Sequence, residues 1–388
     1  MNGERRIALV VPEDLSKESS YTARVMAEAR ALSKFGLVDL YAYDIPESVH
    51  GLCCCHQLRR GGAVSSVSRR ESVRAYWTLC REIVFKRYDY VFVPTVFHPF
   101  FPLLFAAAYV GGSKVIYGMD DPLYETMKIM RKEVTKRSHS PVAASMLVSV
   151  SPLAERLILG LSTYVITVSP SLEAAVVRKH GKGSESVFVA YNFVPTAIEN
   201  PEAQDGEFAR IRNAKDTIVM YFGHIQPEVR GIETVLRAFT LLPSSRYHFV
   251  MMGEIQNREY FEGLVKDLNI EDRVTILKPK PKQEALAYLK KADFGILGPH
   301  PSFALPSKLF DYLYIGIPII LSRSMEDAIQ ILGSSAIVYD GYQDLAETLQ
   351  RAPEYKNRVI PVSVLQTKGI EPLEKRLDDI FSHVFGAA

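Results

Sequence analysis

Short apolar runs rich in β-branched and aromatic residues alternate with longer helical patterns along the 388-residue chain, in two series. The first series of predicted strands comprises Ile7–Val11, Val38–Tyr43, Tyr90–Pro94, Lys114–Tyr117, Tyr164–Val168 and Val187–Tyr191. The second comprises Thr217–Phe222, His248–Met252, Val274–Leu277, Phe294–Leu297, Ile317–Leu321 and Ala336–Val338. Runs of this kind, separated by helices, indicate parallel strands that are buried on both faces.

A polar stretch over residues 192–216 separates the two series. The chain is too long for one average domain and suits two. We therefore predict an α/β protein with two Rossmann-like domains that face a cleft. The expected divisions are an N-terminal domain over 1–195, a linker over 196–216 and a C-terminal domain over 217–370. A last helix, within 371–388, could pack back on the first domain.

Composition excludes several classes of protein. The apolar content of 47% and the charged content of 23% are typical of a soluble globular protein, and the formal charge of +2 gives no argument for nucleic acid as a partner. The longest apolar stretch, residues 97–111, contains two prolines and is too short to span a bilayer. The N-terminal apolar run is predicted as a strand, not a signal peptide.

The cysteines are Cys53, Cys54, Cys55 and Cys80. They show neither a zinc-ligand spacing nor a disulfide framework, so we expect free thiols in a reducing cytoplasm, no metal site and no cofactor.

The segment LPSKLFDYLYIGIPIIL, residues 305–321, indicates a loop, a helix that begins at Pro306 and Ser307, and a stop at Gly316. Free backbone N–H groups at the helix start and the ammonium group of Lys308 would converge on an anion. Asp311, one turn further, could accept hydrogen bonds from a ribose diol. Phosphate beside ribose predicts a nucleotide site. An ordinary helix with a solvated Lys and Asp would show the same spacing.

The loop after the first strand of the second series runs from Gly223 through His224 to Arg230. Ligands of doubly wound sheets bind just outside the carboxyl ends of strands, where this loop falls. Arg230 could bind a phosphate in a bidentate manner, or could be a solvated loop residue. His224 is either a donor to phosphate or a packing residue. Gly253 and Glu254 follow the next strand and could line the same site.

Two further segments carry charged groups after predicted strands. Lys278, Lys280 and Lys282 alternate with prolines, and an extended backbone there could bind the edge of a nucleotide base; solvated lysines are the alternative. Asp120 and Asp121 could orient a hydroxyl nucleophile or bind sugar hydroxyls, although Asp-Asp-Pro is also a good turn sequence.

Taken in order, these segments resemble a retaining glycosyltransferase of the GT-B fold, most closely glycosyltransferase family 4. YFGHIQPEVRGIETVLRAF is similar to the family's Gly-Arg-x-x-x-x-Lys-Gly segment, with one extra loop residue. HFVMMGE, AYLKKADFGILGP and LPSKLFDYLYIGIPII are similar to the later strand, helix and donor-loop segments. The resemblance covers most of the chain and is strongest from Thr217 to Asp344.

The resemblance assigns roles to individual residues of the second domain. Arg230 takes the family's phosphate-binding Lys position, and His224 takes the Arg position after the glycine. Asp311 takes the second acid of the Glu-x7-Glu motif, which is implied to hold the ribose. The first acid falls at Phe303, which is not an acid. Leu305 and its neighbours Ser302 and Ala304 would then contact the sugar through backbone groups or a hydroxyl.

In the first domain, Asp120 or Asp121 falls near the family's His-Asp element, whose His is absent here, with His98 on a separate loop as a substitute. The resemblance implies transfer of a sugar from a nucleotide-diphosphate donor to a hydroxyl acceptor with retention at the anomeric carbon. Arg230, Lys308 and the helix start at Ser307 would stabilise the departing diphosphate without a metal. Loss of one such group typically costs about 3 kcal/mol, so Arg230→Ala is expected to lower turnover strongly.

Two other functions remain open. One is a sugar-nucleotide epimerase of the same fold. The other is a non-catalytic nucleotide-sugar-binding protein, which Phe303 in place of an acid would favour.

The predicted acceptor follows from the charge pattern of the first domain. Basic clusters flank the apolar, aromatic stretch VFHPFFPLLFAAAYV, at Arg59, Arg60, Arg69, Arg70, Arg74, Lys128, Arg131, Lys132, Lys136 and Arg137. Basic groups beside apolar surface can hold a protein at an anionic membrane. This pattern suits a lipid-linked or polysaccharide acceptor and a peripheral position at the inner face of the membrane. Solvated helix faces around a buried helix are the alternative.

Overall fold

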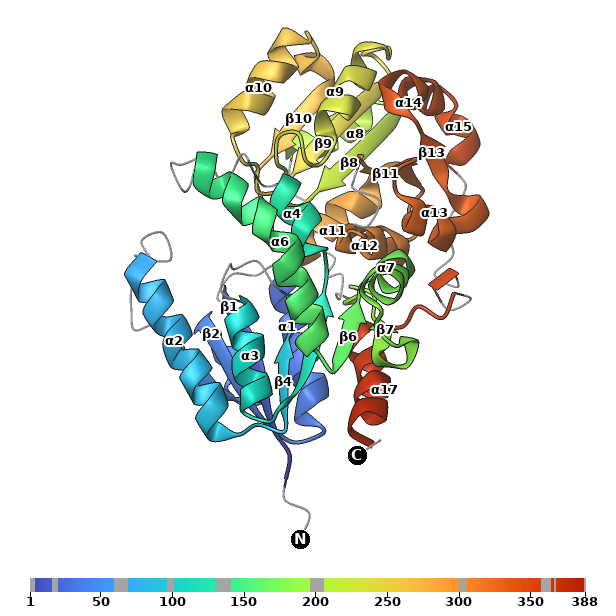
Figure 1. Cartoon of the computed structure of the whole chain (residues 1–388). Coiled ribbons are helices and arrows are strands. Elements are labelled where there is room, and N and C mark those ends of the chain that lie inside the picture. Colours follow the sequence, from blue (N-terminus) through green and yellow to red (C-terminus); the bar gives the residue numbers. More distant parts are fainter. Residues whose placement is uncertain are drawn as a thin grey trace. The chain divides into compact units, whose positions relative to one another are not determined.

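The computed structural model describes residues 4–15, 20–58, 69–95, 101–129, 131, 141–195, 206–299, 305–356, 364–365 and 368–386. The chain divides into two compact units. The first unit comprises Met1–Val194 and Pro372–Ala388, and the second comprises Pro195–Glu371. Both are α/β units with a parallel sheet, as the sequence predicts (Figure 1).

The first unit contains a seven-stranded parallel sheet with the order β3-β2-β1-β4-β5-β6-β7. Its strands are β1 Arg6–Asp14, β2 Leu37–Asp44, β3 Cys54–Gln57, β4 Tyr90–Val93, β5 Lys114–Met119, β6 Tyr164–Thr167 and β7 Val187–Val189. Its helices are α1 Ser20–Ser33, α2 Arg69–Lys86, α3 Phe101–Val110, α4 Leu123–Ile129, α6 Pro141–Leu161, α7 Pro170–His180 and α17 Leu373–Gly386, with short 3-10 turns at Glu47–Val49 and Ser184–Ser186. Strand β3, at the edge of the sheet, was not predicted from the sequence.

Two hydrophobic clusters cover the two faces of this sheet. One gathers the apolar side chains of α1 and α17, and the other gathers those of α2, α3 and α6. Central strand β4 is buried at every position, which explains its continuous apolar sequence. Helix α17 packs on α1, where Phe381 and Phe385 contact Phe35 at ring-centroid distances of 6.3 and 5.3 Å. The last helix of the chain therefore completes the core of the first unit.

The second unit contains a six-stranded parallel sheet with the order β10-β9-β8-β11-β12-β13. Its strands are β8 Thr217–Phe222, β9 Tyr247–Met252, β10 Val274–Leu277, β11 Phe294–Leu297, β12 Ile319–Ser322 and β13 Ile337–Tyr339. Its helices are α8 Gly206–Ala214, α9 Ile232–Thr240, α10 Arg258–Asp267, α11 Lys282–Lys291, α12 Ser307–Ile315, α13 Glu326–Leu332, α14 Gly341–Gln350 and α15 Ala352–Tyr355, with 3-10 turns at Glu271–Arg273 and Gly333–Ser335.

Helix ends follow the expected local chemistry. Ser169 caps α7 through a hydrogen bond that its Oγ accepts from the backbone N–H of Leu172 at 3.2 Å, and Pro170 follows at the first helical position. Gly316 ends α12 with a φ of 82°, a left-handed conformation that glycine adopts without strain. The predicted stop at this glycine is therefore confirmed.

The predicted linker over 196–216 differs from the structure at its second half. Residues 206–214 form α8, and Phe208 on this helix is only 2% exposed. Its ring packs edge-on against Tyr288 of α11 at a centroid distance of 5.2 Å. Polar and charged residues are frequent in this stretch, and only a few apolar residues pack the helix against the rest of the unit. Composition alone therefore suggested a linker.

Candidate functional site

The carboxyl ends of β8 and β9 meet at a pair of glycines. The backbone N–H of Gly223 donates to the carbonyl of Met252 at 2.8 Å, and Gly223 and Gly253 have φ values of 115° and 141°. A Cβ atom on Gly253 would lie 2.0 Å from the carbonyl oxygen of Gly223. A Cβ atom on Gly223 would lie 2.4 Å from Cε of Lys308. Only glycines allow this approach of backbone and lysine.

Lys308 lies in the first turn of α12, directly over the end of β8. Its ammonium nitrogen is 5.3 Å from the ring centroid of Tyr221. Among the residues that the structure describes, no carboxylate lies within ion-pair distance of this nitrogen. Pro306 at the helix start provides no side-chain cap, and the backbone N–H of Leu309 donates to the carbonyl of Pro306 at 3.0 Å. The backbone N–H groups of Ser307 and Lys308 are therefore the ones that could bind an anion. Ser307 begins the helix and Leu305 is buried just before it.

The charged groups at this end of β8 act together on His224. Burial lowers the pKa of its imidazole, the positive charges of Arg230 and Lys308 lower it further, and Glu254 opposes them. The Nδ1 atom of His224 lies 3.9 Å from Oε2 of Glu254. The sequence-predicted residues Gly223, His224, Arg230, Glu254 and Lys308 are therefore gathered at the ends of β8 and β9.

A second close backbone contact positions the turn that contains Arg230. A Cβ atom on Gly298 would lie 2.2 Å from the carbonyl oxygen of Arg230, and one on Gly231 would lie 2.1 Å from Cδ of Pro299. The segment after β11 therefore packs closely against this turn. It leads into residues 300–304, so Phe303, the predicted sugar-side residue, lies outside the described residues.

Asp311 is held by a lysine to which the sequence analysis gave no specific role. Its carboxylate is 8% exposed, and its Oδ1 lies 2.8 Å from Nζ of Lys282. Burial raises the pKa of Asp311, while Lys282 and then Lys308 act in the opposite direction. Lys280, the predicted donor-site lysine, instead pairs with Glu284 at 2.7 Å. Its contact with a donor stays a prediction, as does the contact of Asp311 with a ribose.

In the first unit, Asp120 follows β5 and belongs to a buried polar network. Arg24 of α1 forms an ion pair with Asp120, and its Nε lies 2.7 Å from Oε1 of Glu28. Its Nη1 donates to Oδ1 of Asn192 at 2.7 Å. Arg24 is 2% exposed and Glu28 is fully buried. The neighbouring Asp121 is half-buried.

Burial in this network shifts the pKa of both carboxyl groups upward. Burial raises the pKa of Glu28 to about 7, although Arg24 opposes the shift. Burial also raises the pKa of Asp120, again against Arg24. Arg24 and Glu28 were not predicted from the sequence. A base and an acid four residues apart on the first predicted helix were the available signal. The proposed substitute His98 lies outside the described residues.

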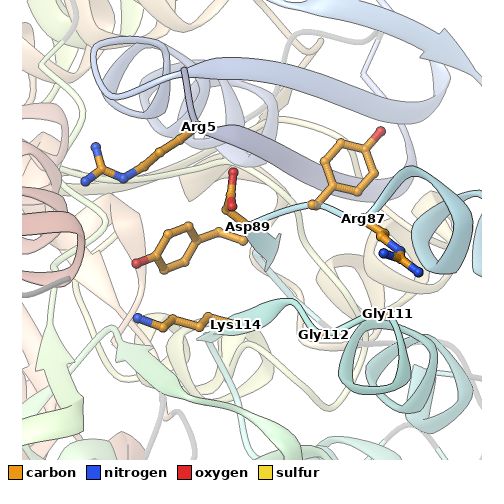
Figure 2. A pocket seen from close by; sticks show the side chains of 8 residues that line it. Arg5, Arg87, Asp89, Gly111, Gly112 and Lys114 are labelled. Atoms are coloured by element: carbon orange, nitrogen blue, oxygen red, sulfur yellow. The ribbon is translucent and has the colours of Figure 1, made fainter. Parts of the chain in front are cut away.

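A cavity of about 380 Å³ lies at the opposite, amino ends of β4 and β5 (Figure 2). Arg5, Arg87 and Lys114 line it, but Figure 2 shows Arg5 and Arg87 pointing in opposite directions. The carboxylate of Asp89 accepts a hydrogen bond from the backbone N–H of Arg6 at 2.8 Å. The cations do not converge on one point, so this cavity is not a second anion site.

Residues 204–357 match the family model of glycosyl transferases group 1. No curated protein matches the chain. Its fold is shared by sucrose-phosphate synthase from Thermosynechococcus elongatus, with a TM-score of 0.69 and 17% identity over 99% of this chain and 100% of that one.

Two further solved structures share the fold. HepE from Anabaena in complex with UDP and glucose gives a TM-score of 0.68 and 12% identity over 99% and 100% of the two chains. A protein from Listeria monocytogenes that is described as a putative UDP-N-acetylglucosamine 2-epimerase gives a TM-score of 0.62 and 9% identity over 99% and 97% of the two chains. The chain thus has the fold of GT-B glycosyltransferases. Its second unit carries a glycosyl transferases group 1 domain, and this supports glycosyl transfer.

Proposed function

We propose that this chain is a retaining glycosyltransferase that moves a sugar from a nucleotide-diphosphate donor to a hydroxyl acceptor. The observation that carries the proposal is Lys308, which lies over Gly223 at the start of α12 without a carboxylate partner in the described ranges. HepE, which has this fold, is described in complex with UDP and glucose, and that supports a nucleotide sugar as the donor.

The proposed mechanism follows from the charge that develops as the diphosphate departs. The bond between the anomeric carbon and the diphosphate oxygen breaks, and a bond to the acceptor oxygen forms on the same face of the sugar. The acceptor hydroxyl loses its proton to the departing diphosphate. Lys308, Arg230 and the amino end of α12 would stabilise the diphosphate without a metal. His224 would contribute as a neutral donor, because its pKa is lowered.

The remaining predicted residues take positioning roles. Asp311, held by Lys282, would bind the ribose, and Glu254 with the backbone near Leu305 would line the donor site. In the first unit, Asp120 and Asp121 would bind hydroxyl groups of the acceptor.

The test of the donor site is titration calorimetry with uridine, guanosine and adenosine diphosphates and their sugars. We expect one nucleoside diphosphate to bind, and Lys308→Ala and Arg230→Ala each to weaken that binding in folded protein. Product analysis by NMR with the binding sugar nucleotide would then report the anomeric configuration. Binding that both variants retain would overturn the proposed site.

A sugar-nucleotide epimerase is the second candidate, because an epimerase-like structure shares the fold. Incubation with the donor alone separates the two functions. An epimerase would convert the sugar nucleotide without an acceptor, whereas a glycosyltransferase would leave it intact or hydrolyse it slowly. A protein that binds the nucleotide sugar but changes it neither with nor without an acceptor would be a non-catalytic binding protein.

The acceptor proposal depends on an apolar surface of the first unit. Helix α3 packs against both α2 and α6, as Figure 1 shows. Their outward side chains are unusually apolar, and those that are at least 46% exposed are Val73, Trp77, Phe85, Leu103, Tyr109, Val110, Val142, Met146, Val150, Leu153 and Leu157. Exposed arginines accompany them at Arg74, Arg81 and Arg156.

Exposed apolar side chains on neighbouring helices, accompanied by basic residues, are typical of proteins that bind an anionic membrane. No helix within the described residues is long and apolar enough to cross a membrane. We therefore propose peripheral binding at the cytoplasmic face of a membrane and a lipid-linked acceptor, such as an intermediate of polysaccharide biosynthesis. Of the predicted basic clusters, Arg59, Arg60, Lys132, Lys136 and Arg137 lie outside the described residues.

Trp77 provides a direct test, because it is the single tryptophan of the chain and is 73% exposed on α2. We expect its fluorescence to shift to the blue with anionic vesicles at low salt, and to do so less with neutral vesicles. Leu153→Ser should weaken co-sedimentation with the same vesicles. Leu241→Ser is the matched control, because Leu241 is 50% exposed in the second unit. An unchanged emission spectrum would remove the membrane proposal.

A further inference from the structure

The edge of the first sheet carries a cluster of side chains that the proposed reaction does not use. Edge strand β3 pairs with β2 so that Cys54 lies opposite Asp39 and His56 lies opposite Tyr41. Side chains two residues apart in a strand emerge on the same face. Cys54 and His56 therefore project together beside Asp39.

The donor atoms of these three residues lie close together. The Nε2 atom of His56 is 2.9 Å from Oδ1 of Asp39, and the donor atoms of Asp39, Cys54 and His56 all lie within 4.8 Å of one another. Around a tetrahedral zinc ion with bonds of about 2.0–2.3 Å, such atoms are about 3.3–3.8 Å apart. Small side-chain rotations would therefore bring them to coordinating positions, with a cation in place of the proton between His56 and Asp39.

We propose that Asp39, Cys54 and His56 bind a divalent transition-metal ion. Sulfur, imidazole and carboxylate ligands suit zinc best, since its protein sites combine these donors. The thiolate and the carboxylate together would neutralise the two charges of the ion. Three protein ligands leave a fourth position for water.

Surrounding contacts hold the ligands in this arrangement. The hydroxyl of Tyr88 donates to Oδ2 of Asp39 at 2.5 Å, so Oδ1 is the oxygen directed at the cluster. The ring of His56 stacks on Tyr41 at a centroid distance of 4.6 Å and an interplanar angle of 17°. Contacts of this kind orient the ligands of metal sites.

Nearby cations are already engaged. Lys86 pairs with Glu82 at 3.0 Å and donates to the hydroxyl of Tyr41 at 2.9 Å. Arg6 lies 3.4 Å from Oδ2 of Asp39, the oxygen that faces away from the cluster. Neither cation therefore pairs with Oδ1 of Asp39, the oxygen that would face the metal.

The cluster lies away from the residues of the proposed reaction. Asp39 is near the amino end of β2 and Cys54 begins β3, whereas Asp120 follows the carboxyl end of β5. The ion would link the four-residue edge strand β3 to β2. A link of this kind protects a short edge strand from detachment.

The test is a cobalt titration of protein that has been stripped of metal with a chelator. We expect one cobalt ion to bind with a thiolate-to-cobalt charge-transfer band, and Cys54→Ser to lose the band. His56→Ala and Asp39→Asn should weaken binding by more than about 100-fold, beyond the usual effect of an outer contact. Zinc should displace the cobalt and raise the Tm of the wild-type protein.

Cys55→Ser is the matched control, because Cys55 is the adjacent thiol and packs toward the core on the other face of β3. This variant should keep the band and the affinity. Since Cys54 is exposed, Cys54→Ser should fold normally, which circular dichroism would verify. A band that survives in Cys54→Ser, a band that disappears equally in Cys55→Ser, or the absence of cobalt and zinc binding would each overturn the assignment.

Discussion

Each unit holds a polar cluster at the carboxyl ends of its parallel strands, and the two clusters differ in how their charge is compensated. In the first unit, Arg24 is 2% exposed and is surrounded by Glu28, Asp120 and Asn192. In the second unit, Lys308 is half-buried and has no ion-pair partner in the described part of the chain. One cluster neutralises itself, whereas the other leaves a cation for a ligand.

The contrast separates stability from binding. A buried network whose members compensate one another contributes to the fold, and the loss of one member leaves the others uncompensated. A cation without a partner contributes little to the fold and is available to stabilise an incoming anion. Loss of the buried Arg24 should therefore change unfolding, and loss of Lys308 should change turnover.

The largest effect is expected for Arg24→Ala, which leaves Glu28 and Asp120 buried without their cation. We expect a loss of about 3–5 kcal/mol in the free energy of unfolding, measured by urea denaturation with circular dichroism. Arg30→Ala is the control on the same helix, since Arg30 is 39% exposed and pairs with Glu374 at 2.8 Å. It should cost less than about 1 kcal/mol. Equal losses of unfolding free energy in the two variants would show that the buried network contributes no more to stability than an exposed ion pair, contrary to the comparison.

Lys308→Ala should have the next largest effect, on turnover and not on stability. Removal of one preorganised cation at the departing diphosphate should lower kcat by about 100-fold, equivalent to about 3 kcal/mol. The urea midpoint should stay unchanged, because no ion pair of the described residues is lost. Lys266→Ala, on an exposed position of α10, should alter neither quantity. A Lys308 variant that unfolds more easily but keeps its kcat would show that Lys308 serves stability and not turnover.

The sequence predicted most of the architecture because buried parallel strands are continuous apolar runs. It missed β3, where Cys54 and Gln57 are exposed and only pairing with β2 makes a strand. It also missed α8, whose docking depends on the single deeply buried ring of Phe208. Both elements are defined by contacts with distant residues, which local periodicity does not record.

The candidate sites show the same difference between local signals and contacts with distant residues. Gly223 and Lys308 were predicted from local signals, a strand end and a helix start, and the structure brings them into contact. The partners Lys282 and Arg24 were not predicted, since each acquires its role from a carboxylate on another element. Local chemistry therefore indicated where the sites are, and tertiary contacts determine which groups neutralise one another.

A third prediction concerns the pH dependence of the first cluster. Burial raises the pKa of Glu28 from about 4.5 to about 7, so the folded protein binds an extra proton between these values. Its stabilising contribution is complete below about pH 4.5 and is lost as the pH rises through about 7. Asp120 shifts in the same direction. Between about pH 5 and 8, the wild type should lose about 1–3 kcal/mol more stability than Glu28→Gln.

Glu374→Gln provides the control for this measurement. Hydrogen bonds and charge from Arg30 and then Lys34 lower the pKa of Glu374 against a burial effect, so its contribution is present throughout the same pH range. The variant should therefore keep the wild-type slope. A wild-type slope that Glu28→Gln also retains would assign the titration to another group.

The smallest effect is expected at the ion pair of Lys282 and Asp311, the compensated part of the second cluster. Lys282→Ala leaves the buried Asp311 carboxylate without its cation, but the lysine side chain is 27% exposed, so solvent screens part of the loss. We expect about 1–2 kcal/mol in the free energy of unfolding, together with a raised KM for the donor if Asp311 binds the ribose. Lys280→Ala, which breaks the partly exposed pair between Lys280, just before α11, and Glu284 on that helix, should cost less than about 1 kcal/mol. If both variants had the same small effect on stability and none on KM, Asp311 would be only a packing residue, and its ion pair with Lys282 would not belong to the second cluster.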